Sequence, residues 1–142
     1  MAMSERILED AAAAHGISFV TLRYFNVAGA DPKGRAGEIG KPTHLIKAAA
    51  QIAIGAREEK LKIFGDDYPT PDGTAIRDYV HVADLAQAHM EAVSYLRGGG
   101  ASVILNCGDG RGYSVQEVVG AFERVTNKEM PFEIVPRREG DP

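Results

Sequence analysis

Residues 17–25 read Ile17-Ser-Phe-Val-Thr-Leu-Arg-Tyr-Phe25, an almost uninterrupted apolar run that contains one arginine. A strand of this kind is typical of a parallel sheet that is buried on both faces beneath helices. The preceding residues predict such a helix over 4–15, which Ser4 can cap and which Gly16 ends. A helix followed directly by a buried strand indicates the α/β class.

The same alternation continues along the chain. Further strands are predicted at 60–64, 76–82, 103–107 and 132–135, and further helices at 43–56, at 84–96 with Asp84 as cap, and from Ser114 onward. The last helix opens with the capping box Ser114-Val-Gln-Glu117 and carries Val125 on its apolar face. Residues 26–42 and 65–75 are rich in glycine and proline and predict loops. We therefore expect one α/β region over residues 1–142.

Composition and charge exclude several classes of protein. The 142 residues have an ordinary globular composition and are numerous enough to bury a core. The net charge of −4 gives no electrostatic case for binding nucleic acid or a membrane surface. No apolar run is long enough to span a membrane, and the first residues lack the apolar stretch of a signal peptide. Cys107 is the one cysteine, which excludes a disulfide framework and fits a cytoplasmic setting.

Common catalytic motifs are missing from the sequence. The four histidines are scattered, without cysteine or carboxylate at metal-ligand spacing, and Asp66, Asp67 and Asp72 do not match a calcium loop. There is no Gly-x-Ser-x-Gly elbow, and no tyrosine is followed four positions later by lysine. We therefore expect no catalytic residue and no metal site in this chain.

Two glycine-rich segments call for comparison with dinucleotide-binding loops. Such a loop needs a strand that ends just before the first glycine and a helix that starts on the last. Residues 34–40 begin far beyond the strand that ends near Phe25, so they predict a surface loop. Residues 108–112 do lie between a strand and a helix, but Asp109 would face the phosphates. A tight turn is the better interpretation there.

The run from Phe64 to Asp84 has the clearest binding chemistry. Arg77 and Tyr79 are two positions apart in an extended segment, so their side chains share one face. A guanidinium beside an aromatic ring suits a phosphorylated ligand that contains a ring. The alternatives are a structural ion pair for Arg77 and a core position for Tyr79.

Three segments together resemble a known enzyme family. They are Leu22-Arg-Tyr-Phe-Asn-Val-Ala-Gly-Ala-Asp-Pro32, Gly65-Asp-Asp-Tyr-Pro-Thr-Pro-Asp-Gly-Thr-Ala-Ile-Arg-Asp-Tyr-Val-His-Val82 and Val135-Pro-Arg-Arg-Glu-Gly-Asp141. They resemble the C-terminal half of the UDP-glucose 4-epimerases, NAD-dependent members of the extended short-chain dehydrogenase/reductase superfamily. The resemblance covers nearly the whole chain. It implies a substrate-binding portion together with the last elements of a Rossmann-type parallel sheet.

The resemblance also implies roles for individual residues. Arg77 and Arg138 match arginines that bind the diphosphate, Tyr79 shares the face of Arg77, and Asp141 matches an acceptor for a ribose hydroxyl. Further matches are Asn26 near the sugar and phosphates, His44 and Leu45 at a helix start that meets the nucleotide, Lys62 and Phe64 in the uracil pocket, and Tyr24 close to the nicotinamide. Asp78, His81 and Asp84 are interpreted as structural.

Other interpretations of these residues remain open from the sequence. Asn26 can be a turn residue, and Lys62 a member of an alternating edge strand. Arg138 and Asp141 can belong to an exposed charged tail, and many members of the family carry asparagine at the position of His44.

The family activity requires parts that this sequence lacks. In the resembled enzymes a tyrosine deprotonates the sugar 4-hydroxyl while hydride passes to NAD, and the 4-keto sugar turns over and takes the hydride back. The glycine-rich NAD loop and the Tyr-x-x-x-Lys pair belong to their N-terminal half. We therefore expect an internal fragment that binds UDP-sugar, is inactive alone and does not bind NAD alone. The alternatives are a related nucleotide-sugar dehydratase or epimerase, and a standalone binding module.

Self-association is a further expectation. The first helix corresponds to one that lies in the family's dimer interface, and the strand at 17–25 would have an apolar face and open edges without its neighbours. We therefore expect a homodimer or a higher assembly.

Overall fold

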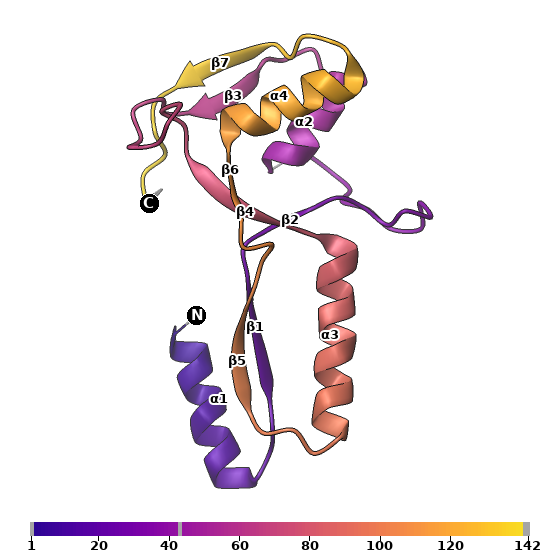
Figure 1. The fold of residues 1–142 in the computed structure, drawn as a ribbon, viewed down its shortest axis with the longest axis vertical. Helices are drawn as coiled ribbons and strands as arrows, with labels where there is room; N and C mark the ends of the chain where they lie inside the picture. Colours follow the sequence, from indigo (N-terminus) through magenta and orange to yellow (C-terminus); the bar gives the residue numbers. More distant parts are fainter. Residues whose placement is uncertain (1, 43, 141–142) are drawn as a thin grey trace.

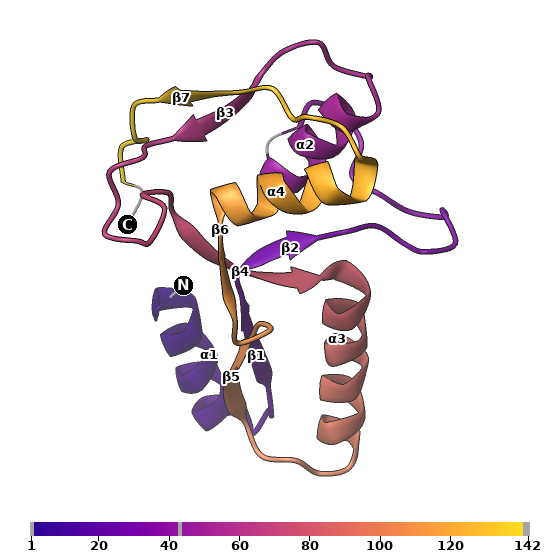
Figure 2. The same ribbon diagram turned by 45° about the horizontal axis from the view of Figure 1, so that its top comes forward.

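The computed structural model describes residues 2–42 and 44–140, which form two halves joined by three crossing strands (Figure 1). The lower half in Figure 1 contains α1 (Ala2–His15), β1 (Val20–Tyr24), α3 (Val82–Arg97) and β5 (Val103–Cys107). β1 and β5 pair in parallel, from Val20 opposite Val103 to Tyr24 opposite Cys107. The helices α1 and α3 lie on either side of this strand pair in both views (Figures 1 and 2).

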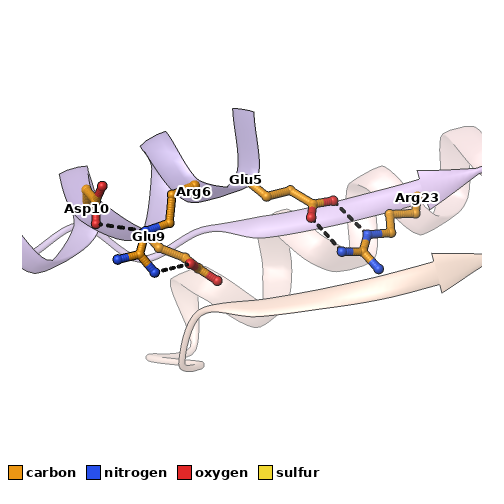
Figure 3. A network of polar contacts seen from close by, with 5 residues as sticks. All are labelled: Glu5, Arg6, Glu9, Asp10 and Arg23. Carbon is orange, nitrogen blue, oxygen red and sulfur yellow. Dashed lines mark hydrogen bonds and ion pairs between the residues drawn. The ribbon is translucent and has the colours of Figure 1, made fainter. Parts of the chain in front are cut away.

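An ion pair connects the first helix to the first strand. Glu5 of α1 is 8% exposed, and Arg23 of β1 donates to both of its carboxylate oxygens (Figure 3). The hydrogen bonds from Arg23 lower the pKa of Glu5 and raise that of Arg23. On the outer side of the helix, Arg6 pairs with Glu9 and Asp10 at 3.6 and 3.5 Å, where all three side chains are exposed (Figure 3).

The upper half contains the main hydrophobic core. Its elements are α2 (Leu45–Ala53), β3 (Leu61–Phe64), α4 (Val115–Thr126) and β7 (Phe132–Val135). β3 and β7 pair in parallel, and the two helices lie together against this pair (Figure 1). Ala49, Leu61, Ile63, Val119 and Met130 form the buried cluster, each at most 4% exposed. The predicted alternation of 60–64 is thus confirmed.

Three strands cross between the halves. β2 (Asn26–Ala28) pairs in parallel with β4 (Ile76–His81), which pairs antiparallel with β6 (Gly112–Ser114) (Figure 2). The capping box predicted at the start of the last helix is confirmed. Ser114 Oγ accepts from the Glu117 N–H at 3.0 Å, and the Ser114 N–H donates to Glu117 Oε2 at 2.8 Å.

Several predictions of local structure were wrong. Ser4 lies inside α1 because the helix already starts at Ala2, and α3 starts at Val82 because His81, not Asp84, caps it: the Ala83 N–H donates to His81 Nδ1 at 3.1 Å. Residues 26–42 are not all loop, since pairing with β4 makes β2 a strand. Val125 is 86% exposed, because it lies on the face of α4 that points away from the core.

The strand at 17–25 is less buried than its composition predicts. Among the described residues β1 pairs with β5 alone, so one of its edges is open. Tyr24 and Phe25 are 48% and 55% exposed. None of the helices in the described part of the chain is long and apolar enough to cross a membrane.

Candidate functional site

A cleft of about 1440 Å³ lies between the two halves and is lined by residues from both. Every candidate binding residue except Asp141, which lies outside the described residues, lines it: Tyr24, Asn26, His44, Leu45, Lys62, Phe64, Arg77, Tyr79 and Arg138. These residues come from β1, β2, β3, β4, the start of α2 and the segment after β7. The fold therefore brings together positions that are up to 114 residues apart in sequence, from Tyr24 to Arg138.

The middle of β4 supplies a cation and a phenol to one wall of the cleft. The pleat directs Arg77 and Tyr79 to the same side, as the two-residue spacing predicts. Arg77 Nη1 donates to the Ile76 carbonyl at 2.9 Å, which orients the guanidinium. Burial raises the pKa of the Tyr79 hydroxyl, and the positive charge of Arg77 opposes this rise. Tyr79 is therefore a neutral donor at physiological pH.

Asn26 is the first residue of β2 and lies opposite Tyr79 in the strand pair. Its Nδ2 donates to the Asp78 carbonyl at 3.3 Å, so the side-chain amide is oriented by the neighbouring strand. This position puts a polar amide directly beside the residues of β4 that line the cleft. The interpretation of Asn26 as a turn residue is wrong, because strand pairing includes it.

The N-terminus of α2 opens onto the cleft at His44 and Leu45. His44 has extended backbone angles (φ −112°, ψ 148°), and its exposed side chain makes no capping hydrogen bond. The first backbone N–H groups of a helix have no partner within the helix and carry partial positive charge. With no acidic residue in the first turn of α2, this end of the cleft favours an anionic ligand.

Arg138 and Phe64 form a stacked pair in the lining of the cleft. The guanidinium carbon of Arg138 lies 3.7 Å from the centroid of the Phe64 ring. The preceding residue is held in the same way, because Arg137 lies 3.8 Å from the Tyr68 ring centroid and donates from Nε to Asp67 Oδ1 at 2.6 Å. These contacts hold Arg137 and Arg138 against the end of β3 and the turn that follows it, although both arginines are exposed.

Lys62 and Tyr24 lie at exposed parts of the cleft wall. The Lys62 ammonium is 3.9 Å from Glu133, its register partner on β7, so the lysine also belongs to an alternating edge strand as its sequence pattern allows. The Tyr24 ring lies 6.4 Å from that of His89 on α3, at an interplanar angle of 58°.

Some lining residues were not identified from the sequence. Val82, Ala86 and Met90 recur at every fourth position of α3 and form one wall, and this helical spacing was the signal that could have found them. Asp31 and Arg35 line the cleft from the loop after β2, joined by hydrogen bonds of 2.7 and 3.0 Å. Arg35 lowers the pKa of Asp31 to about 2.

The chain is similar to known proteins in both sequence and fold. Residues 2–108 match the model of the NAD dependent epimerase/dehydratase family. The chain belongs to this family. Among curated members of the epimerase/dehydratase family, the UDP-glucose 4-epimerase of Azospirillum brasilense is 57% identical over 141 residues. That of Halalkalibacterium halodurans is 54% identical over 130 residues.

Solved epimerase structures share the fold of this chain. UDP-glucose-4-epimerase from Stenotrophomonas maltophila, with bound NAD and formylated UDP-arabinopyranose, superposes with a TM-score of 0.90 at 46% identity and covers 98% of the chain. The enzyme from Bifidobacterium longum, in complex with NAD+ and UDP, gives 0.85 at 41% identity and covers 98%. The match covers 42% of each solved chain, and 40% and 39% of the two curated relatives. The chain thus spans about two-fifths of the length of these family members.

Neither of the two glycine-rich loops has the geometry of a dinucleotide-binding loop in the described structure. The Asp78 carboxylate fills the turn at 108–110, where it accepts from the N–H groups of Asp109 and Gly110 at 2.9 and 3.0 Å. The loop at 34–40 is exposed and does not join a strand to a helix directly. Among the described residues no three histidine, cysteine or carboxylate side chains come together as metal ligands.

Proposed function

We propose that this chain is the UDP-sugar-binding part of a UDP-glucose 4-epimerase, which interconverts UDP-glucose and UDP-galactose. The observation that carries the proposal is the cleft, which unites Arg77, Tyr79, Phe64 and Arg138 with the N-terminus of α2. The identity to enzymes of that name supports the same reaction.

The cleft chemistry matches the parts of such a ligand. Two guanidinium groups, of Arg77 and Arg138, suit a diphosphate, because each offers several N–H donors in one plane. The α2 N-terminus adds partial positive charge. Phe64, at the end of β3, offers an apolar ring face to a pyrimidine, and Asn26 offers an amide to the hydroxyls of a sugar. Asp141 is proposed to accept from a ribose hydroxyl.

The residues of this chain bind and orient, and we assign no catalytic residue among them. NAD and the general base of the reaction are proposed to be held by polypeptide beyond this chain, with Tyr24 at the boundary between the two. The isolated chain is therefore proposed to be inactive. It is also proposed to be cytoplasmic, since the sequence has a single cysteine and no disulfide pair.

A second copy of the chain is proposed as a partner. Met3 and Ile7 lie one turn apart on α1 and are 79% and 62% exposed. The neighbouring strand β1 has an open edge in the described structure. An apolar helix face beside an unpaired strand favours self-association into a dimer or a larger assembly.

Titration calorimetry with the purified chain tests the nucleotide site. UDP and UDP-glucose are expected to bind more tightly than ADP. Arg77→Ala is expected to weaken UDP binding by roughly tenfold or more, the cost of losing charge-assisted hydrogen bonds. Arg97→Ala, at the exposed end of α3, is the matched control and should leave affinity unchanged. Tighter binding of ADP than of UDP, or equal effects of the two arginine variants, would contradict the proposal.

A further inference from the structure

Asp72 lies in the turn before β4 and is hydrogen-bonded to three groups. Its Oδ1 accepts from the N–H and from the hydroxyl of Thr74, at 2.9 and 2.7 Å, and its Oδ2 accepts from the hydroxyl of Ser114. Thr74 and Ser114 are 0% and 3% exposed. Burial disfavours the charged form of Asp72, but the hydrogen bonds from Ser114 and Thr74 outweigh this effect and lower its pKa. Asp72 is therefore held as an ionised acceptor.

Through these bonds Asp72 connects the turn to the capping box of α4. Ser114 is both the last residue of β6 and the N-cap of α4. Thr74 Oγ1 also accepts from the Gln116 N–H at 3.3 Å, and the Val115 N–H donates to the Ala75 carbonyl at 3.1 Å. Each hydroxyl in the network donates once, to Asp72, and accepts once from α4, so the direction of every bond is fixed.

A second carboxylate holds the opposite end of the same strand pair. Asp78, on β4, accepts from the Asp109 and Gly110 N–H groups just before β6. The register pairs Ile76 with Ser114, Arg77 with Tyr113 and Asp78 with Gly112. Arg77 is thus the central residue of a ladder of three residue pairs. The Asp72 carboxylate binds Ser114 at one end of this ladder, and the Asp78 carboxylate binds the Asp109 and Gly110 N–H groups at the other end.

We propose that Asp72, together with its partner Thr74, is a positioning residue that fixes the β4–β6 ladder and so holds the Arg77 guanidinium at the cleft wall. The Asp72-Gly73-Thr74 motif then has a binding role although its residues do not line the cleft. The importance of this placement for diphosphate recognition rests on the proposed function.

Two substitutions remove hydrogen-bonding groups of this network while nearly preserving the shape of the side chains. Asp72→Asn keeps the size of the side chain but replaces one acceptor oxygen with an N–H₂ group, on a side chain where three hydroxyl or N–H donors converge. Thr74→Val is close to isosteric and removes the hydroxyl, whereas Thr74→Ser retains it. Asp66→Asn, in the same turn, changes the same charge on an exposed side chain outside this network and serves as the control.

The first measurement needs no ligand. By NMR, amide exchange at Val115 and Gln116 should accelerate by roughly tenfold in Asp72→Asn and in Thr74→Val, as expected for the loss of buried hydrogen bonds. The Arg77 Nε–Hε group should become more mobile in the same variants, while amides of β1 and β5 stay unchanged. Thr74→Ser and Asp66→Asn should resemble the original chain. Exchange that rises evenly over the whole chain, or an unchanged Arg77 signal, would overturn the proposal.

The second measurement compares UDP with uridine, which lacks phosphates. Loss of Arg77 placement should reduce UDP affinity by roughly tenfold and uridine affinity little, because only the diphosphate loses charge-assisted bonds. General destabilisation would lower both affinities in parallel, and that result would overturn the positioning role. If the original chain binds neither compound, the proposed function fails, while the ligand-free measurement still decides the role of Asp72.

Discussion

Arg23 of β1 donates from Nε to Glu5 Oε1 at 2.6 Å and from Nη2 to Oε2 at 2.5 Å, a two-bond pair that joins the first helix to the first strand. Glu5 is largely shielded from solvent although Arg6, Glu9 and Asp10 around it are exposed. The pair therefore fixes how α1 packs on the only strand pair of the described lower half.

Glu5→Gln is expected to lower the melting temperature of the chain at pH 7 by a few degrees. The pKa of Glu5 is below 4.5 in the folded state because of Arg23. Its stabilising contribution is thus fully present above the pKa of the unfolded state and is lost as the pH falls through the lower folded value. The difference between the two proteins, followed by circular dichroism, should shrink below about pH 4.5. Glu9→Gln, which removes only an exposed contact, should have little effect at any pH.

The elements that could be predicted from sequence are those fixed by local signals. The alternation of Leu61 and Ile63 predicted a strand with one buried face, and the capping box at Ser114 depends on residues only three positions apart. β2 and β6 were missed because each has three residues and exists only by pairing with β4. The cap of α3 was misassigned because the sequence does not show that β4 leads directly into the helix at His81.

The candidate site, too, could be predicted only where a local sequence pattern determines the arrangement. The two-residue spacing was enough to put Arg77 and Tyr79 on one face of a strand. The stacking of Arg138 on Phe64 joins residues from the ends of two strands that are paired only in the folded chain, and no local pattern contains that information. The resemblance to the epimerase family identified both residues as candidates, but their contact depends on the pairing of β3 with β7.

Gly73 and Gly110 have nearly the same backbone φ, +77° and +76°, but very different surroundings. A Cβ atom at Gly73 would lie 2.0 Å from the Asp66 carbonyl oxygen, whereas one at Gly110 would meet nothing within 4 Å. Gly110→Ala should therefore cost about 1 kcal/mol in unfolding free energy, from the backbone conformation alone. Gly73→Ala should cost roughly a further 1–3 kcal/mol, because backbone must move. Urea denaturation of both variants measures these losses of unfolding free energy. Equal losses would show that the turn at Gly73 accommodates a Cβ atom without additional cost.

Arg138 and Phe64 are expected to act as a unit in nucleotide binding. Arg138→Met keeps an unbranched stem over the ring but removes the charge, and Phe64→Leu keeps an apolar residue but removes the ring. Each substitution should weaken UDP binding. The binding free energy lost in the double variant should be smaller than the sum of the two single losses, by about 0.5–1 kcal/mol, the size of an exposed cation–π contact. Calorimetry on all four proteins gives the coupling, and strict additivity would mean that the stacked pair makes no joint contribution.

Self-association of the chain is expected to depend on α1. Ile7→Glu places a charge on the apolar side of the helix and should shift the chain toward monomer without unfolding it, because Ile7 is 62% exposed. Val125→Glu makes the same chemical change at a residue that is 86% exposed on α4, in the other half of the molecule, and should leave the association unchanged. Sedimentation velocity over a wide range of protein concentrations distinguishes the two. A chain that stays monomeric at the highest concentration, or an equal response of both variants, would show that the α1 face is not the contact surface.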